Sequence, residues 1–174
     1  MGLPTNMHFI RRRLESHQKV IDPFVTKGQV AADLGCGSGV YTIALAQIVG
    51  LQGKVYAVDL DKKCIQMLEK KIEKEGYHNI EIHASSASDL SFIQDKSVDF
   101  VLANGLLCSM ADHRPEAVNE IKRILKPEGQ AFLSLGFTPP FGFVNRSELE
   151  KILEGFRIDR SGGFFEKWAL VKTL

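Results

Sequence analysis

Three glycines and an acid form the most informative group of residues in the sequence. Gly35, Gly37 and Gly39 alternate with small residues in the stretch DLGCGSG, directly after a short apolar run. Glycines at this spacing let a ligand approach the main chain closely and leave backbone amides free to bind it. Asp59 lies twenty residues after Gly39, and an acid there can accept hydrogen bonds from two ribose hydroxyls. We therefore predict a site for a ligand that contains a nucleoside.

The glycine spacing and a second acid argue against a dinucleotide. The dinucleotide fingerprint G-x-G-x-x-G/A requires a small residue at position 40, where this sequence has Val40. Asp33 lies two residues before the first glycine. Its carboxylate would repel a pyrophosphate but could serve an amino group, directly or through water. The predicted ligand has a ribose, a cationic end and no phosphate, which disfavours a nicotinamide-dependent oxidoreductase.

Alternating strands and helices are predicted to position these residues. The predicted strands are 30–34, 54–60, 79–85, 98–104, 130–135, 156–160 and 164–173, and the predicted helices are 7–21, 41–49, 62–76, 114–125 and 147–155. The KPEG segment at 126–129 fits a turn. This order predicts an α/β fold: a Rossmann-like, seven-stranded, mostly parallel sheet with an antiparallel last strand and helices on both faces. Ligands of such sheets bind beyond the carboxyl ends of the strands, here the first, second and fourth.

Size, charge and cysteine usage restrict the class of protein. A chain of 174 residues suits one domain, and 22 Lys and Arg against 21 Asp and Glu give no overall charge argument for nucleic acid. Arg11 to Arg13 are the one basic run. No apolar stretch is long enough to span a membrane, and the N-terminal charges follow the apolar patch, unlike a secretory signal. Three cysteines without CxxC spacing predict neither disulfides nor a metal site, so we expect a cytoplasmic protein.

Taken together, these motifs resemble the class I S-adenosylmethionine (SAM)-dependent methyltransferases. VAADLGCGSGVYTIAL followed by VYAVDLD looks like the glycine loop and acid of that family. SASDLSFIQDKSVDFVLANGLL resembles its third-to-fourth strand region, and EIKRILKPEGQAFLSL resembles its fifth-strand entry. The resemblance runs from about Val30 to about Leu135, in the style of small-molecule enzymes such as the quinone C-methyltransferases. It implies SAM as the cofactor.

The same resemblance implies an organisation of the whole chain as a single methyltransferase domain, 1–174. An N-terminal helical segment would cover 1–28, and the cofactor-binding core would cover 29–135. A C-terminal substrate-side segment with a β-hairpin would cover 136–174.

The resemblance also implies which residues bind the cofactor. They are Asp33, Gly35, Cys36, Gly37, Gly39, Asp59, Leu60, Ser86, Ala87 and Asn104. Gly35 and Gly37 would pass close to the methionine part of SAM, with Asp33 oriented toward its amino group. Asn104, at the end of the fourth strand, would lie near the methionine end. Cys36 is interpreted as a small filler in the loop.

The adenosine side is expected to involve the next two strand ends. Asp59 would hold the ribose and Leu60 would pack on the adenine. Ser86 and Ala87 would flank the adenine edge. Many relatives have an Asp where Ser86 aligns, and a serine hydroxyl accepts more weakly, so Ser85 or Asp89 could substitute.

The acceptor is less well defined by the sequence. No convincing general base is visible, so no catalytic residue is assigned. The family's Asn/Asp-Pro-Pro-Tyr/Phe motif for amino-group targets is absent, because NGLLCSM follows the fourth strand. We predict a methyltransferase with a small-molecule acceptor. The alternatives are an RNA or protein methyltransferase, or a non-catalytic SAM-binding partner subunit. A homodimer that completes the pocket also stays open.

Overall fold

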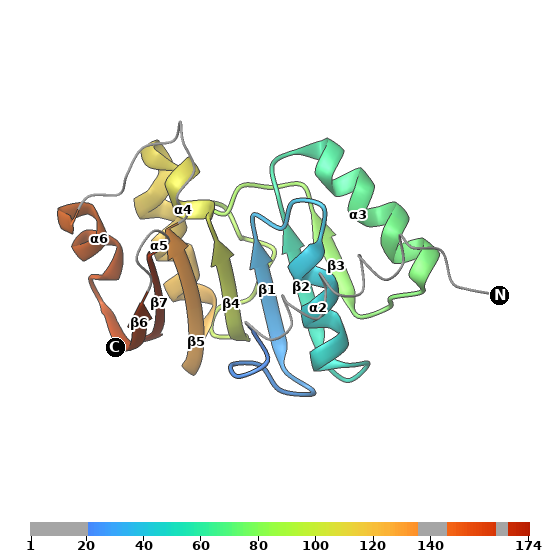
Figure 1. Cartoon of the computed structure of the whole chain (residues 1–174), viewed down its shortest axis with the longest axis horizontal. Coiled ribbons are helices and arrows are strands. Elements are labelled where there is room, and N and C mark those ends of the chain that lie inside the picture. The colour runs from blue at the N-terminus through green and yellow to red at the C-terminus, as the bar shows by residue number, and fades with distance from the viewer. Residues whose placement is uncertain (1–20, 136–145, 163–166) are drawn as a thin grey trace.

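The chain folds around one seven-stranded sheet (Figure 1). The computed structural model describes residues 21–135, 146–162 and 167–174. The strands are β1 (Val30–Leu34), β2 (Lys54–Val58), β3 (Ile80–His83), β4 (Val98–Asn104), β5 (Leu125–Leu135), β6 (Phe156–Gly162) and β7 (Lys167–Thr173). Their order is β3-β2-β1-β4-β5-β7-β6, with β1 to β5 parallel and β7 antiparallel to both neighbours. The predicted mostly parallel sheet with a reversed last strand is confirmed.

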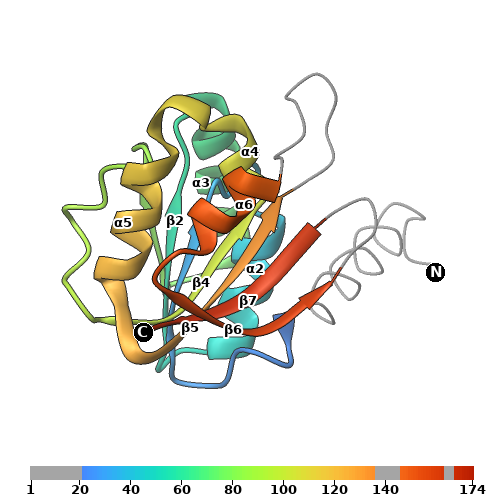
Figure 2. The same cartoon turned by 90° about the vertical axis from the view of Figure 1, so that its left-hand side faces the viewer.

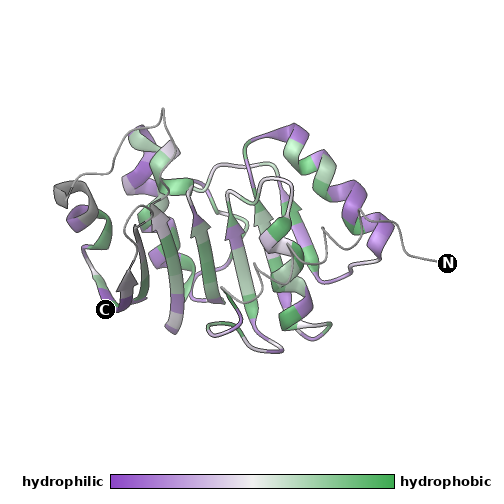
Figure 3. Cartoon of the chain, in the orientation of Figure 1, coloured by the Kyte–Doolittle hydropathy of each residue, from purple (hydrophilic) through white to green (hydrophobic). Residues whose placement is uncertain are grey.

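Helices cover both faces of this sheet. They are α2 (Val40–Val49), α3 (Lys62–Glu75), α4 (Leu106–Ser109), α5 (Arg114–Ile124) and α6 (Arg146–Leu153), with a 3-10 turn η1 (Ala111–His113). Successive strand residues point to opposite faces. Ala31 therefore belongs to the buried cluster with Leu45 of α2, and Ala32 to the cluster with Val118 of α5 and Ile152 of α6. Figure 3 shows the hydrophobic residues on the central strands and hydrophilic residues along α3.

The sequence predicts three helix ends: Asp61 can cap the helix at 62–76, Gly76 can end it, and Gly50 suits the position after the helix at 41–49. Asp61 caps α3, because its Oδ1 accepts the N–H of Lys63 at 2.8 Å. Gly76 ends the same helix with a left-handed φ of 72°, and Gly50 ends α2 with a φ of 66°. These capping predictions are confirmed.

The predicted KPEG turn is wrong, because residues 126–129 lie within β5. Val98 pairs with Leu125 whereas Phe100 pairs with Gln130, so β5 carries the extra residues of a bulge. Pro127 has no N–H to give to the strand ladder. A Cβ at Gly129 would lie 2.9 Å from the carbonyl oxygen of Val98. The segment therefore stays extended and close to β4 without regular pairing.

The predicted N-terminal helix at 7–21 lies almost wholly outside the described residues, and so do 136–145 of the substrate-side segment. Ile21 and Val25 are described, and both are buried in the cluster that contains α2. The division of the chain into three segments stays a prediction. None of the helices in the described ranges combines the length and apolar character needed to cross a lipid bilayer.

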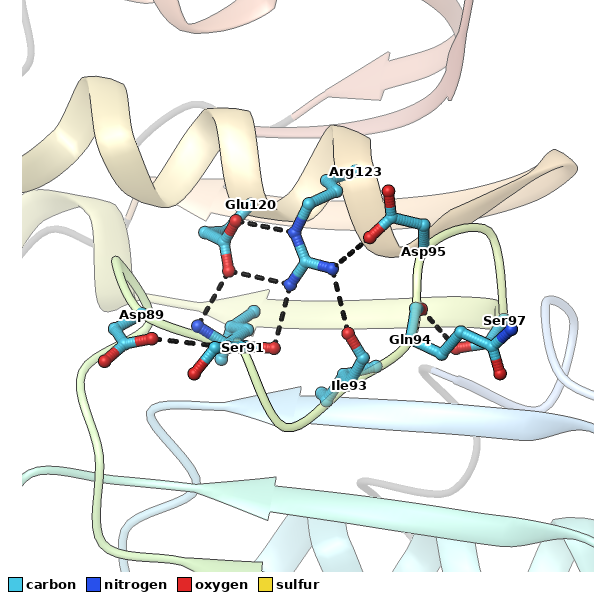
Figure 4. A network of polar contacts seen from close by, with 9 residues as sticks. Asp89, Ser91, Ile93, Gln94, Asp95, Ser97, Glu120 and Arg123 are labelled. Atoms are coloured by element: carbon cyan, nitrogen blue, oxygen red, sulfur yellow. Dashed lines mark hydrogen bonds and ion pairs between the residues drawn. The ribbon is translucent and has the colours of Figure 1, made fainter.

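One arginine ties the connection between β3 and β4 to α5 (Figure 4). Arg123 donates from Nε and Nη2 to the two carboxylate oxygens of Glu120, at 2.7 and 2.8 Å. Its Nη1 donates to Asp95 at 2.5 Å, and the same guanidinium donates to the carbonyl oxygens of Leu90 and Ile93. Glu120 also accepts the N–H of Leu90 at 2.7 Å. The hydrogen bonds from Arg123 hold the pKa of Glu120 below its ordinary value.

We expect Arg123→Ala to lower the free energy of unfolding by roughly 1.5–3 kcal/mol, because two carboxylates and two carbonyls lose a charged donor. Arg123→Lys should recover only part of this, since an ammonium cannot reproduce the forked geometry. Urea unfolding measures the loss, and hydrogen exchange should rise at the amides of 89–97.

Arg157→Ala is the matched control, because Arg157 is 61% exposed and its guanidinium contacts one carboxylate at 3.3 Å. Its loss should stay below about 0.5 kcal/mol. Equal losses in Arg123→Ala and Arg157→Ala would contradict the role of Arg123 in fixing the connection.

Candidate functional site

A cavity of about 270 Å³ opens where β1, β2 and β4 end. Strand order reverses at β1, which lies between β2 and β4, and ligands of open parallel sheets bind at such a switch point. Five predicted residues line the cavity: Gly35, Asp59, Leu60, Ala87 and Asn104. The other lining residues are Val58, Ser85, Gly105, Leu106, Ser109 and Met110. The cavity therefore lies at the strand ends where the sequence predicts a ligand.

Asp59 links the end of β2 to the glycine loop. Its Oδ2 accepts the N–H of Gly37 at 2.7 Å, and its Oδ1 accepts the N–H of Asp61 at 2.8 Å. Its own N–H donates to the carbonyl oxygen of His83 on β3 at 3.2 Å. Each carboxylate oxygen keeps a further lone pair. The side chain is thus fixed by the backbone and can still accept hydrogen bonds from the cavity.

Leu60 is an apolar side chain left largely in water beside this carboxylate. It is 67% exposed and lines the cavity. A flat, weakly polar ring placed against it would remove apolar surface from water, which is favourable. Its position is compatible with the predicted packing against an adenine.

Glycine is required at the three loop positions for different structural reasons. All three adopt left-handed φ values, 74° at Gly35, 53° at Gly37 and 80° at Gly39. A Cβ at Gly35 would lie 3.0 Å from Leu106, and a Cβ at Gly39 would lie 2.2 Å from Leu68. At Gly37 nothing lies within 4 Å of such a Cβ. Gly35 and Gly39 are therefore required by close contacts within the protein, and Gly35 also lines the cavity, whereas the space beside Gly37 is open.

Asp33 lies behind the loop and does not line the cavity. It is 3% exposed, and its Oδ2 accepts the hydroxyl hydrogen of Thr42 on α2 at 2.6 Å. Burial raises the pKa of Asp33 to about 7, and the nearby negative charge of Asp59 adds to the effect. The predicted orientation of Asp33 toward an amino group stays a prediction. Its observed partner joins the start of the loop to α2.

Cys36 is a packing residue in this structure. It is buried with Ile43 of α2 and with Ile65 and Leu68 of α3. Burial, together with the charge of Asp33, raises the pKa of its thiol above the ordinary value. All three cysteines of the chain are free thiols. Within the described ranges no three metal-ligating side chains come together.

Of the two residues predicted after β3, Ala87 lines the cavity and Ser86 does not. Ser85 lines the cavity, and its hydroxyl donates to the carbonyl oxygen of Asp89 at 3.1 Å. The Oγ of Ser86 lies 2.7 Å from the Oγ of Ser88 and accepts the N–H of Ser88 at 3.2 Å. Ser86 therefore stabilises the turn and is not among the lining residues. That Ser86, Ser85 or Asp89 replaces the family's Asp stays a prediction.

The sequence interpretation missed the residues of α4 and its flanks. Gly105 has a left-handed φ of 71° and donates its N–H to the carbonyl oxygen of Ser134. The chain that follows β4 then lines the cavity with Leu106, Ser109 and Met110. A helix of four residues has no periodic pattern to detect. The available signal was the position of NGLLCSM directly after the fourth strand.

We expect Gly39→Ala to lower the free energy of unfolding by roughly 2–4 kcal/mol. It adds a methyl group against the fully buried Leu68 and places a Cβ on a left-handed residue. Gly76→Ala is the control, with a φ of 72° and nothing within 4 Å, so it should lose only about 1 kcal/mol. Urea denaturation of both variants measures the difference. Equal losses would show that packing against α3 is not the reason for Gly39.

Asp33 predicts a pH dependence of stability. Its folded pKa of about 7 exceeds the ordinary 3.8, so between these values the folded state binds more protons than the unfolded state. The wild type should therefore lose stability as pH rises from about 4 to 7, by at most roughly 4 kcal/mol. Asp33→Asn does not titrate and should lack this loss, as measured by urea unfolding across the pH range. Parallel curves for both proteins would refute the assignment.

Comparison with known proteins agrees with this geometry. The family model described as "Methyltransferase domain" matches residues 31–129, more than half of the chain. A demethylmenaquinone methyltransferase of Geobacillus stearothermophilus is 35% identical over 120 residues, which cover 68% of this chain and 50% of that protein. The chain therefore spans about half the length of the curated relatives it matches.

Solved structures share the fold over nearly the whole chain. A SAM-dependent methyltransferase from Aquifex aeolicus superposes with a TM-score of 0.77 at 25% identity, covering 98% of this chain and 100% of that one. A TehB-like SAM-dependent methyltransferase from Corynebacterium glutamicum gives 0.72 at 20% identity, covers 97% of each chain and supports the fold alone. With the matched domain, the sheet order and the cavity at the switch point, the chain belongs to the SAM-dependent methyltransferase family.

Proposed function

We propose that this chain binds SAM at the switch-point cavity and transfers its methyl group to a small-molecule acceptor. The observation that carries the proposal is the carboxylate of Asp59 on the amide of Gly37. In a phosphate-binding loop such an amide would face the anion. Here a carboxylate occupies it, with the carboxyl of Asp33 buried behind the same loop. These two carboxyl groups fit a nucleoside that has a cationic end and no phosphate.

The lining residues can be matched to the parts of SAM. Asp59 would hold the ribose hydroxyls, and Leu60 would pack on the adenine. Ser85 and Ala87 would border the adenine edge. The methionine part would lie toward Gly37 and Asn104. Asp33 would support the loop through Thr42, near the amino group that its charge favours.

Methyl transfer mainly requires that the acceptor and the methyl group are correctly positioned. When bound, SAM supplies a methyl group that its sulfonium already activates. The chain contributes alignment and exclusion of water, and such positioning can supply roughly 7–11 kcal/mol of the barrier. Among the cavity-lining residues that the structure describes, Asp59 is the one with an ionisable side chain, and it is held by two backbone amides. We therefore assign no general base and propose an acceptor that arrives ionised or readily gives up its proton.

A quinone precursor is the acceptor class that we favour. The relatives matched over 120 residues are named demethylmenaquinone methyltransferases. A quinol ring bears acidic hydroxyl groups and so suits a cavity without a base. The chain spans about half the length of those relatives. The proposal of the acceptor therefore draws on a smaller part of the relatives than the assignment of the cofactor does. The alternatives stay an RNA or protein acceptor and a non-catalytic SAM-binding role. A homodimer and a cytoplasmic location also stay predictions.

We expect Asp59→Asn to weaken SAM binding about 100-fold, because charged hydrogen bonds to the ribose are lost. Calorimetric titration measures it, with the wild type expected to bind SAM and S-adenosylhomocysteine but not NAD. Asp61→Asn is the control, because Asp61 accepts from Lys63 at the start of α3 and does not line the cavity. Unchanged affinity in Asp59→Asn would end the ribose assignment.

Transfer itself is tested with a labelled methyl donor. The wild type should label a quinol acceptor, and Asp59→Asn should not at the same SAM concentration. Tight SAM binding without labelling of any small-molecule fraction would favour the non-catalytic alternative. Labelling of RNA or protein fractions would reassign the acceptor.

A further inference from the structure

Two neighbouring hollows lie on the α5 side of the molecule. The first, about 630 Å³, lies between α5 and the end of α6, and the second, about 600 Å³, lies at the start of β5 beside β6 and β7. Lys122 and Gly155 line both hollows, so the two hollows are neighbours on the surface. Figure 2 shows this side, with α5, α6 and the ends of the outer strands facing the viewer. We call the two hollows together the α5–α6 groove.

The α5–α6 groove concentrates positive charge in a chain that is nearly neutral. Its lining includes six cationic side chains, Lys96, Arg114, Lys122, Lys151, Arg157 and Lys172. Two acidic side chains, Glu128 and Glu154, line the same groove. The whole chain has 22 Lys and Arg against 21 Asp and Glu. Six cationic against two acidic side chains in the lining of these neighbouring hollows mark this surface as attractive to an anion.

Three of these cations form no ion pair with a carboxylate among the residues that the structure describes. Lys122 donates to the carbonyl oxygen of Glu154 at 2.5 Å and not to its carboxylate. Arg157 and Lys172 share the single carboxylate of Asp159, at 3.3 and 3.7 Å. For Lys96 and Lys151, no ion pair with another residue of the described ranges is present. Their charge is available to a ligand.

The remaining lining favours a peptide over a nucleic acid. Side chains of Pro115, Val118, Leu125, Pro127 and Ile152 give the groove apolar surface. Among the described residues that line it there is no Phe, Tyr or Trp, and single-stranded nucleic acids are usually bound by stacking on such rings. Carboxylate side chains spaced along a peptide can reach the lysines while apolar side chains lie on the floor.

We propose that the α5–α6 groove binds an acidic segment of a partner protein that also carries apolar residues. The groove begins at Ala111 of η1, directly after Met110 of the cavity. A bound partner would therefore lie beside the mouth of the cavity, while most of its contacts lie on α5, α6 and the opposite end of the sheet. The binding does not depend on methyl transfer.

The test uses a short fluorescent peptide in which Glu alternates with Leu and Gly, titrated by fluorescence anisotropy. The wild type should bind it saturably, and raised salt should weaken binding. The double variant Lys96→Glu/Lys151→Glu should raise Kd tenfold or more. The control Lys70→Glu/Lys74→Glu makes the same charge change on exposed positions of α3 and should change Kd less than threefold. Calorimetry with SAM should give the same affinity in both variants, which shows that they are folded.

Three results would overturn the proposal. The first is no saturable binding of the Glu peptide, or equal binding of a counterpart with Gln in place of Glu. The second is an equal loss in the α3 control, which would mean that only overall charge matters. The third is tighter binding of a single-stranded RNA oligonucleotide that the groove variant abolishes, which would assign the groove to nucleic acid.

Discussion

The hydrogen bond between the N–H of Gly37 and the carboxylate of Asp59 joins the two strand ends on which the site is built. Parallel pairing of β1 with β2 brings Leu34 opposite Val58, so the residues that follow each strand leave the sheet side by side. The loop needs a left-handed glycine at 37 to turn its amide toward the acid. Once that contact forms, the loop cannot offer this amide to a phosphate. The choice of ligand class is thus made by one contact inside the protein.

The features predicted from sequence are those that depend on local chemistry. The strands were predicted from alternating apolar runs. The ends of α3 were predicted from Asp61 and Gly76, because helix capping involves residues that are neighbours in sequence. The glycine loop and Asp59 were recognisable from spacing alone. The turn predicted at KPEG is wrong because Leu125 and Gln130, on either side of it, pair with β4, and sequence distance hides that contact.

The less predictable parts of the site depend on tertiary contacts. Ser85 and Ser86 differ by one position, and only the turn held by Ser88 and Asp89 decides which side chain faces the cavity. The absence of Asp33 from the cavity lining follows from its hydrogen bond to Thr42, a contact between β1 and α2 that the sequence does not reveal. Nothing near Arg123 in sequence indicates that it holds the residues leading from the cavity to β4.

The buried carboxyl of Asp33 has a consequence for the ligand-free protein. A carboxyl whose pKa is about 7 can be neutral when no cation is near, so the empty protein need not desolvate a lone negative charge. A positively charged group arriving in the cavity would favour the ionised form and release a proton. The charge behind the loop would then adjust to occupancy, and ligand affinity would be coupled to the proton concentration of the surroundings.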